Sequence, residues 1–213
     1  MAKKYQAIET KVHWLTWTAM GLIVAALIAM LIIIQPSEKD VFYSSYFSVT
    51  TDADFAKKLP EDNKFQIIKS LENGFLSQGL YEKAANDSQL TIVYFGEPNE
   101  TSASAIANVY ARLYGASRSS IPVPVSDLYT ALSDEGVAIY YYEVKLDAVN
   151  DLVTSLNEKY EDADMVITTS PFVIAFLNGK VVDYTVVSGE NIPRLMMEFY
   201  DEVLASDAVQ ALI

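Results

Sequence analysis

Residues 168–187 read TTSPFVIAFLNGKVVDYTVV, and this stretch decides the fold. The dipeptide Asn178-Gly179 is a strong turn signal, because both residue types tolerate the positive φ that a two-residue hairpin turn requires. Apolar runs lie on both sides of it, at residues 172–177 and 180–187. The stretch therefore predicts a β-hairpin.

Apolar patterning upstream of the hairpin predicts alternating helices and strands. The expected order is an amphipathic helix at 65–86, a strand at 89–95, a helix at 103–116, a short helix at 125–132, a strand at 137–144 and a helix at 147–160. After the hairpin, Ser188 or Asn191 is expected to cap a last helix that runs through Leu204. A βαβ unit is thus followed by a hairpin and a closing helix.

This order of elements resembles the thioredoxin superfamily over residues 65–204. The phrase PFVIAFLNGK at 171–180 is typical of that family, in which the proline, here Pro171, is preceded by a cis peptide bond. The resemblance implies an α/β fold, a three-layer sandwich with a mixed central sheet. It also implies that Pro171 faces the place where the family carries a Cys-x-x-Cys pair.

The chain departs from the family at that pair. The matching positions read Glu-Thr-Ser-Ala, with Glu100 and Ala103 in place of the cysteines, and the chain contains no cysteine. Disulfide exchange requires a thiolate that attacks a sulfur atom, so this activity is excluded. The resemblance then implies a former active site kept for binding a partner. Its expected residues are Glu100, Thr101, Ser102, Thr169, Ser170 and Pro171.

Two interpretations of the former active site are open. Glu100 is either a retained polar contact or a helix N-terminal acid favoured by the macrodipole, and Thr101 and Ser102 are candidate caps. An alternative function is a non-thiol enzyme or a glutathione-type binding protein that uses these hydroxyl and carboxylate groups. The sequence offers no general base or metal ligand beside them, so we expect no catalysis, no cofactor and no metal.

The only histidine, His13, lies outside the expected domain. A Ser-His-Asp triad and a histidine metal site are therefore excluded there.

Residues 14–34 form an uncharged apolar run of 21 residues. As a helix, this run spans roughly 30 Å, the hydrocarbon thickness of a bilayer. A signal peptide has a shorter apolar core of about 7–15 residues. We therefore predict a retained signal anchor. Lys3, Lys4 and Lys11 precede it against Glu9 alone, so the N-terminus is expected to be cytoplasmic and the rest extracytoplasmic, at the plasma membrane.

The expected organisation has four parts: a cytoplasmic tail at 1–13, the transmembrane anchor at 14–34, a juxtamembrane connector at 35–64 and the extracytoplasmic domain at 65–213. Four aromatic residues of the connector are either interfacial side chains at the outer membrane surface or core residues of a folded segment. They are Phe42, Tyr43, Tyr46 and Phe47.

Small residues recur along one face of the anchor, at Gly21, Ala25 and Ala29. A four-residue spacing of small side chains lets membrane helices pack closely. The alternative is that glycine and alanine are simply common in such helices.

The net charge and the order of anchor and domain limit the classes of partner that the chain could bind. Residues 35–213 carry 12 basic and 27 acidic side chains, which argues against nucleic acid and suits either a cationic partner or ordinary solubility. We expect an accessory subunit of a membrane-associated or secretion-related complex, contacted by both anchor and ectodomain. An extended partner segment would pair with backbone groups beside Pro171. The layout also resembles bacterial accessory proteins of bacteriocin transport, whose thiol chemistry this chain lacks.

Overall fold

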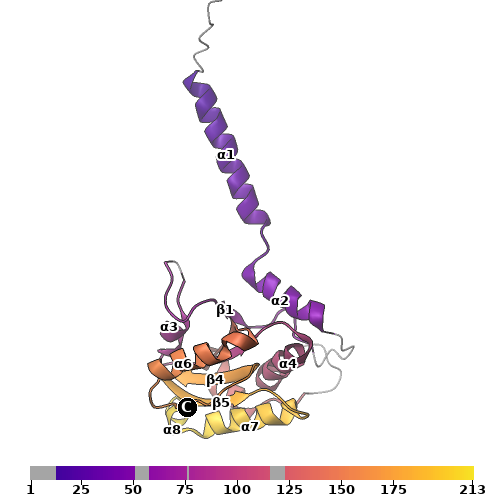
Figure 1. Cartoon of the computed structure of the whole chain (residues 1–213), viewed down its shortest axis with the longest axis vertical. Coiled ribbons are helices and arrows are strands. Elements are labelled where there is room, and N and C mark those ends of the chain that lie inside the picture. Colours follow the sequence, from indigo (N-terminus) through magenta and orange to yellow (C-terminus); the bar gives the residue numbers. More distant parts are fainter. Residues whose placement is uncertain (1–12, 51–57, 76, 116–122) are drawn as a thin grey trace, which may run out of the picture. The chain divides into compact units, whose positions relative to one another are not determined.

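The computed structural model describes residues 13–50, 58–75, 77–115 and 123–213 (Figure 1). The chain divides into two compact units, Met1–Ser37 and Glu38–Ile213. The first unit contains helix α1 (Trp14–Ile34). The second contains a five-stranded sheet and the helices that cover it.

The sheet is mixed, and its strand order is β1-β3-β2-β4-β5. Its strands are β1 (Gln66–Ile68), β2 (Leu90–Gly96), β3 (Val137–Glu143), β4 (Phe172–Leu177) and β5 (Lys180–Val186). Strands β1 and β2 run parallel to β3, whereas β4 runs antiparallel to β2 and β5. Parallel βαβ pairing followed by an antiparallel hairpin confirms the α/β, thioredoxin-like fold expected from the sequence.

Helices cover both faces of this sheet. One core contains residues of α2 (Glu38–Val49), α4 (Glu100–Tyr114), α5 (Asp127–Gly136), α7 (Ile192–Ala205) and α8 (Asp207–Gln210). The other contains residues of α3 (Leu80–Ala84) and α6 (Val149–Lys159), which follows the short 3-10 turn η2 (Leu146–Ala148). Alternate residues of β4 enter the two cores, so the strand is apolar throughout.

Local chemistry fixes the turn and the last helix as expected. Asn178 and Gly179 have φ of 52° and 70°, and their N–H groups donate to carbonyls of residues 86 and 84 at 2.8 and 2.9 Å. The cap of α7 is Asn191, whose side chain accepts from the N–H of Arg194. Of the two expected caps, Asn191 is therefore the one used.

The predicted helix at 65–86 is wrong. Residues 66–68 form β1, a loop follows, and only Leu80–Ala84 is helical. Ile67 packs toward one core and Ile68 enters the other, which is the period of a strand. A helix over residues 65–86 would place Phe75 on its apolar, core-facing side. In the structure the Phe75 side chain is instead 98% exposed.

Helix α2 lies inside the expected connector and belongs to the core. Phe42 and Tyr46 are 5% and 1% exposed, and the Phe42 ring lies 4.5 Å from that of Tyr141 and 5.7 Å from that of Phe65. Phe47 is 54% exposed. The aromatics thus divide between core and surface, and the compact unit begins at Glu38 instead of residue 65. The sequence Thr51-Asp52-Ala53-Asp54-Phe55, in the connector, also predicts a helix start, and these positions lie outside the described residues.

Asp183 places a half-buried carboxylate in β5, opposite Ala175 of β4. Burial raises the pKa of this carboxyl, a hydrogen bond from the N–H of Tyr184 (2.8 Å) partly offsets the rise, and the negative charge of Glu202 on α7 adds to it. The folded chain therefore binds the Asp183 proton more tightly than the unfolded chain does.

We predict that Phe42→Ala lowers the free energy of unfolding by about 3–5 kcal/mol, because it leaves a cavity between α2 and the sheet. Phe47→Ala is the matched control on the same helix and should change it by less than about 0.5 kcal/mol. Urea unfolding of the full chain in mild detergent, followed by the near-UV circular dichroism of its tyrosines, measures both. Equal effects would mean that α2 does not pack on the sheet.

We predict that Asp183→Asn stabilises the protein at pH 7 by about 1 kcal/mol or less, since solvent screens a half-exposed group. The wild-type carboxyl contributes most below its unfolded-state pKa, near 4, and that contribution is lost as pH rises through the raised folded-state pKa. The gain should therefore vanish at pH 4. Asp201→Asn, at an exposed position of α7, is the control. An equal gain at both pH values would contradict the assignment.

Candidate partner-binding site

The centre of the predicted site is Pro171, directly before β4. The Ser170-Pro171 peptide bond is cis, as the resemblance implied. The carbonyl of Pro171 accepts a hydrogen bond from the N–H of Val187 at 2.8 Å. The proline is therefore held between the start of β4 and the end of β5.

Gly96, at the end of β2, packs directly against Pro171. A Cβ atom on Gly96 would lie 3.2 Å from the Cβ of Pro171 and 3.0 Å from a ring carbon of Tyr94, so only glycine fits without displacing them. The carbonyl of Gly96 accepts from the Tyr141 hydroxyl at 3.0 Å and from the N–H of Val144 at 3.2 Å. The loop after β2 is thus fixed beside the cis-proline.

The first turn of α4 supplies the other half of the predicted site. Asn99 is its N-cap and accepts from the N–H of Ser102 at 2.8 Å, so the expected capping by Thr101 or Ser102 is wrong. Glu100 and Thr101 are exposed, whereas Ser102 is fully buried. The hydroxyl oxygen of Ser102 has no hydrogen-bond partner in the described part of the chain.

Tyr94 connects the two halves. Its hydroxyl donates to the carbonyl of Ser102 at 3.2 Å, and its ring lies against Gly96, which in turn meets Pro171. The structure therefore places the first turn of α4 and the Ser170-Pro171 segment around the same end of β2.

Buried phenols lie behind this site. The ring of Tyr141 lies 5.6 Å from that of Tyr46 and 6.3 Å from that of Tyr94. Burial raises the pKa of all three hydroxyls. They consequently stay protonated at physiological pH, where they serve as hydrogen-bonding and packing groups and not as bases.

The segment in front of Pro171 presents free backbone groups. Thr169 is exposed, and within the described residues neither its N–H nor its C=O makes a hydrogen bond. Its hydroxyl donates to the carbonyl of Ser170 at 3.4 Å. Unpaired backbone donors and acceptors beside a strand are what an added strand requires.

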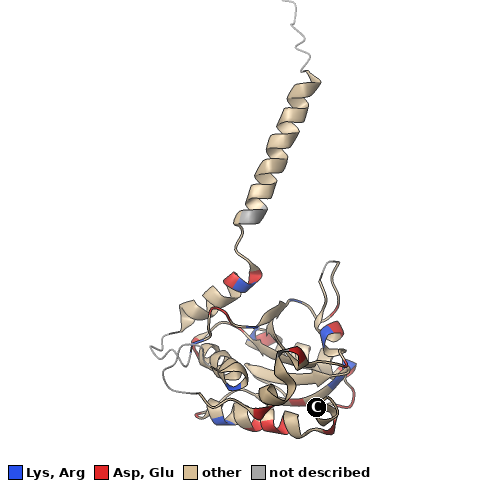
Figure 2. Ribbon diagram, turned by 180° about the vertical axis from the view of Figure 1, so that it is seen from behind, with Lys and Arg blue, Asp and Glu red and all other residues tan. Residues whose placement is uncertain are grey.

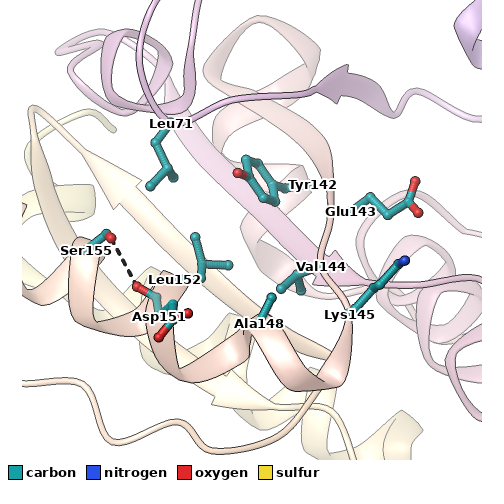
Figure 3. Close-up of a pocket in the computed structure, with 9 residues that line it drawn as sticks. All are labelled: Leu71, Tyr142, Glu143, Val144, Lys145, Ala148, Asp151, Leu152 and Ser155. Carbon is teal, nitrogen blue, oxygen red and sulfur yellow. Dashed lines mark hydrogen bonds between the residues drawn. The ribbon is translucent and has the colours of Figure 1, made fainter.

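A separate groove of about 450 Å³ lies on the α6 side of the sheet (Figure 3). Apolar side chains form most of its wall, with charged groups among them. Its lining residues are Leu71, Tyr142, Glu143, Val144, Lys145, Ala148, Asp151, Leu152 and Ser155. These residues come from the loop after β1, the end of β3, η2 and α6. Because these segments are remote from one another in sequence, no local sequence pattern predicts the groove.

The anchor expectation stays a prediction. Residues Trp14–Leu31 of α1 have a mean hydropathy of 2.0 and are long and apolar enough to cross a membrane, a test that a signal sequence also passes. Gly21, Ala25 and Ala29 are all exposed on this helix. His13 caps α1, with its ring nitrogen accepting from the N–H of Leu15 at 3.4 Å.

Comparison with known proteins leaves the family open. No protein-family model and no curated protein matches the chain. Solved structures that match include thioredoxin of Malassezia sympodialis, at 11% identity and a TM-score of 0.37, covering 65% of this chain and 92% of that one. Thioredoxin of Trypanosoma brucei brucei matches at 12% identity and a TM-score of 0.34, covering 67% and 96%. The fold assignment rests on strand order and on the position of Pro171.

The chemical conclusion follows from composition and fold together. A thioredoxin-like fold without any cysteine has no thiolate at the start of α4 and cannot exchange disulfides. Among the described residues, no group of three or more His, Asp or Glu side chains converges. What the site offers is exposed backbone, a fixed proline and one exposed carboxylate.

We predict that the double variant Glu100→Cys, Ala103→Cys forms an internal disulfide under mild oxidation, because the sequence resemblance aligns these positions with the thiol pair of thioredoxins. Free-thiol titration before and after reduction measures it, with Glu100→Cys alone as the control that stays titratable. Two cysteines whose Cα atoms lie more than about 7 Å apart cannot be bridged without backbone movement. Two persistently free thiols would therefore show that the loop is aligned incorrectly with the family.

Proposed function

We propose that this chain is a membrane-anchored, redox-inactive thioredoxin-like protein that binds an extended segment of a protein partner. The observation that carries the proposal is the exposed, unpaired backbone of Thr169 beside the cis-proline. In this role the protein is an accessory subunit of a membrane-associated or secretion-related complex.

The binding mode is strand addition. Thr169 offers one N–H and one C=O to a partner strand, and the buried Pro171, packed against Gly96, fixes the backbone directly behind it. Backbone hydrogen bonds supply affinity in this mode, while neighbouring side chains supply specificity. Glu97 and Glu100 flank the site in the sequence, and residues 35–213 carry 12 basic against 27 acidic side chains. A partner segment with basic side chains therefore suits the site best.

The anchor gives the site its location. With α1 retained as a single-pass span, the excess of lysine before it places the N-terminus in the cytoplasm and the folded unit outside the plasma membrane. The face formed by Gly21, Ala25 and Ala29 then offers a second contact with a partner inside the bilayer. A membrane complex that uses both surfaces gains from the raised effective concentration of the second contact.

The non-thiol enzyme has weaker support. Of the two candidate hydroxyls, that of Ser102 is fully buried, so it is closed to a substrate. The hydroxyl of the exposed Thr101 makes no hydrogen bond to a carboxylate base among the described residues. Nucleophilic catalysis needs such a base within hydrogen-bonding reach.

We predict that Thr169→Pro weakens partner binding roughly tenfold, because proline removes the N–H and with it a hydrogen bond of about 1–1.5 kcal/mol. Thr169→Ala keeps the backbone donor and should bind as the wild type does. The measurement is quantitative mass spectrometry of proteins that co-purify with the full chain extracted from native membranes in mild detergent.

A photo-crosslinking residue at position 169, compared with one at the exposed Glu161, covers the case in which the proline variant folds poorly. Crosslinking to the same protein from 169 alone supports the proposal. Failure to recover any stoichiometric partner, or equal binding by the alanine and proline variants, overturns it.

A further inference from the structure

The loop between β1 and α3 is ordered by its own hydrogen bonds. The N–H of Gly74 donates to the carbonyl of Ser77 at 2.9 Å, and the N–H of Gly79 donates to the side chain of Asn73 at 2.8 Å. The N–H of Leu80 closes the base on the carbonyl of Ser70 at 3.0 Å. The described residues of the loop, 69–75 and 77–79, thus form a small projection closed at its base, with Gly74 and Ser77 joined near its tip.

Phe75 lies at that tip with 98% of its surface exposed. Among the described residues of the folded unit, the next most exposed large apolar side chain is that of Val166, at 78%. Transfer of this ring from water into an apolar phase would gain about 25 cal/mol for each Å² of apolar surface buried.

The loop is tied to the first residue of the folded unit. The ammonium group of Lys69, at the loop base, lies 2.6 Å from a carboxylate oxygen of Glu38. Within this unit the loop extends on the side where α2 begins, and the C-terminus lies on the other side (Figures 1 and 2). The loop tip and Glu38 therefore share one end of the unit.

Chain length brings that end to the membrane surface if α1 is a retained span. Only residues 35–37 separate α1 from Glu38. Four extended residue steps cover at most about 14 Å, and the headgroup region on each side of the hydrocarbon core is about 5–8 Å thick. Glu38 then lies within or just above the headgroups.

The charge of the unit selects the type of contact. With 27 acidic and 12 basic side chains, residues 35–213 are repelled by anionic lipid (Figure 2). The loop itself carries only Lys69 and Glu72 as charged residues. A membrane contact at this end must therefore be apolar, which is what an exposed phenylalanine provides.

We propose that Phe75, in the loop between β1 and α3, is a second membrane contact and inserts into the interface between headgroups and acyl chains. The inference rests on the proposed retention of the anchor.

The test uses the absence of cysteine. Single cysteines at Phe75→Cys and, as control, Ile213→Cys at the 62% exposed C-terminus carry a nitrobenzoxadiazole label in the full chain, reconstituted into phosphatidylcholine vesicles. The label at 75 should show blue-shifted emission, quenching by doxyl-labelled lipid and protection from iodide. The label at 213 should show the reverse. Neither result should change with 1 M salt, which reduces the Debye length to about 3 Å.

A label at Ser77→Cys leaves Phe75 in place and therefore distinguishes the loop's own affinity for lipid from the affinity of the dye for lipid. With Phe75 present this label should be quenched by doxyl lipid, and Phe75→Asp in the same chain should abolish the quenching. A water-exposed label at 75 on vesicles that carry the protein overturns the inference alone. Protection of the label at 75 from iodide in native membranes but not in vesicles also overturns the inference, because it shows that Phe75 contacts a protein and not lipid. Failure of the chain to float with the vesicles overturns both the anchor and the inference.

Discussion

Burial of the two central strands on both faces is the constraint from which the architecture follows. Every residue of β2 and of β4 is buried. Burial of apolar surface gains about 25 cal/mol per Å². Because both faces of these strands are apolar, each face of the sheet is covered by a layer of helices. Helices α4 and α7 supply one layer, and α6 supplies the other.

The position of the site is a consequence of how these strands pair. Phe95 of β2 lies opposite Phe172 of β4, and their rings stack at 4.7 Å. The next residue of β2, Gly96, and the preceding residue of the other strand, Pro171, must then meet. A change of register by one residue would turn every side chain to the opposite face, so the core protects the geometry of the site. This geometry is present although the chain contains no cysteine.

The absence of cysteine and the rigid arrangement around Pro171 both favour binding over catalysis. Behind the site, the buried phenols of Tyr46, Tyr94 and Tyr141 support the loop after β2 without titrating at physiological pH. In front of it, Thr169 leaves its backbone unpaired. Helix α2 joins the same core through Phe42, so the folded unit begins directly after the candidate span. This arrangement supports the proposed role as a rigid binding surface.

The sequence by itself determined the elements whose signals are local. The Asn178-Gly179 turn and the buried runs of β2, β3 and β4 depend on neighbouring residues, and the absence of thiol chemistry follows from composition. The cap of α7 was open between Ser188 and Asn191, and the structure uses Asn191. Tertiary structure decided where local signals compete or are missing. Residues 66–68 became a strand because β3 offered them backbone partners, and Phe42 became core because the sheet offered it a surface. The exposure of Phe75 and the unpaired backbone of Thr169 likewise depend on which distant segments pack nearby, and spacing along the chain does not encode that.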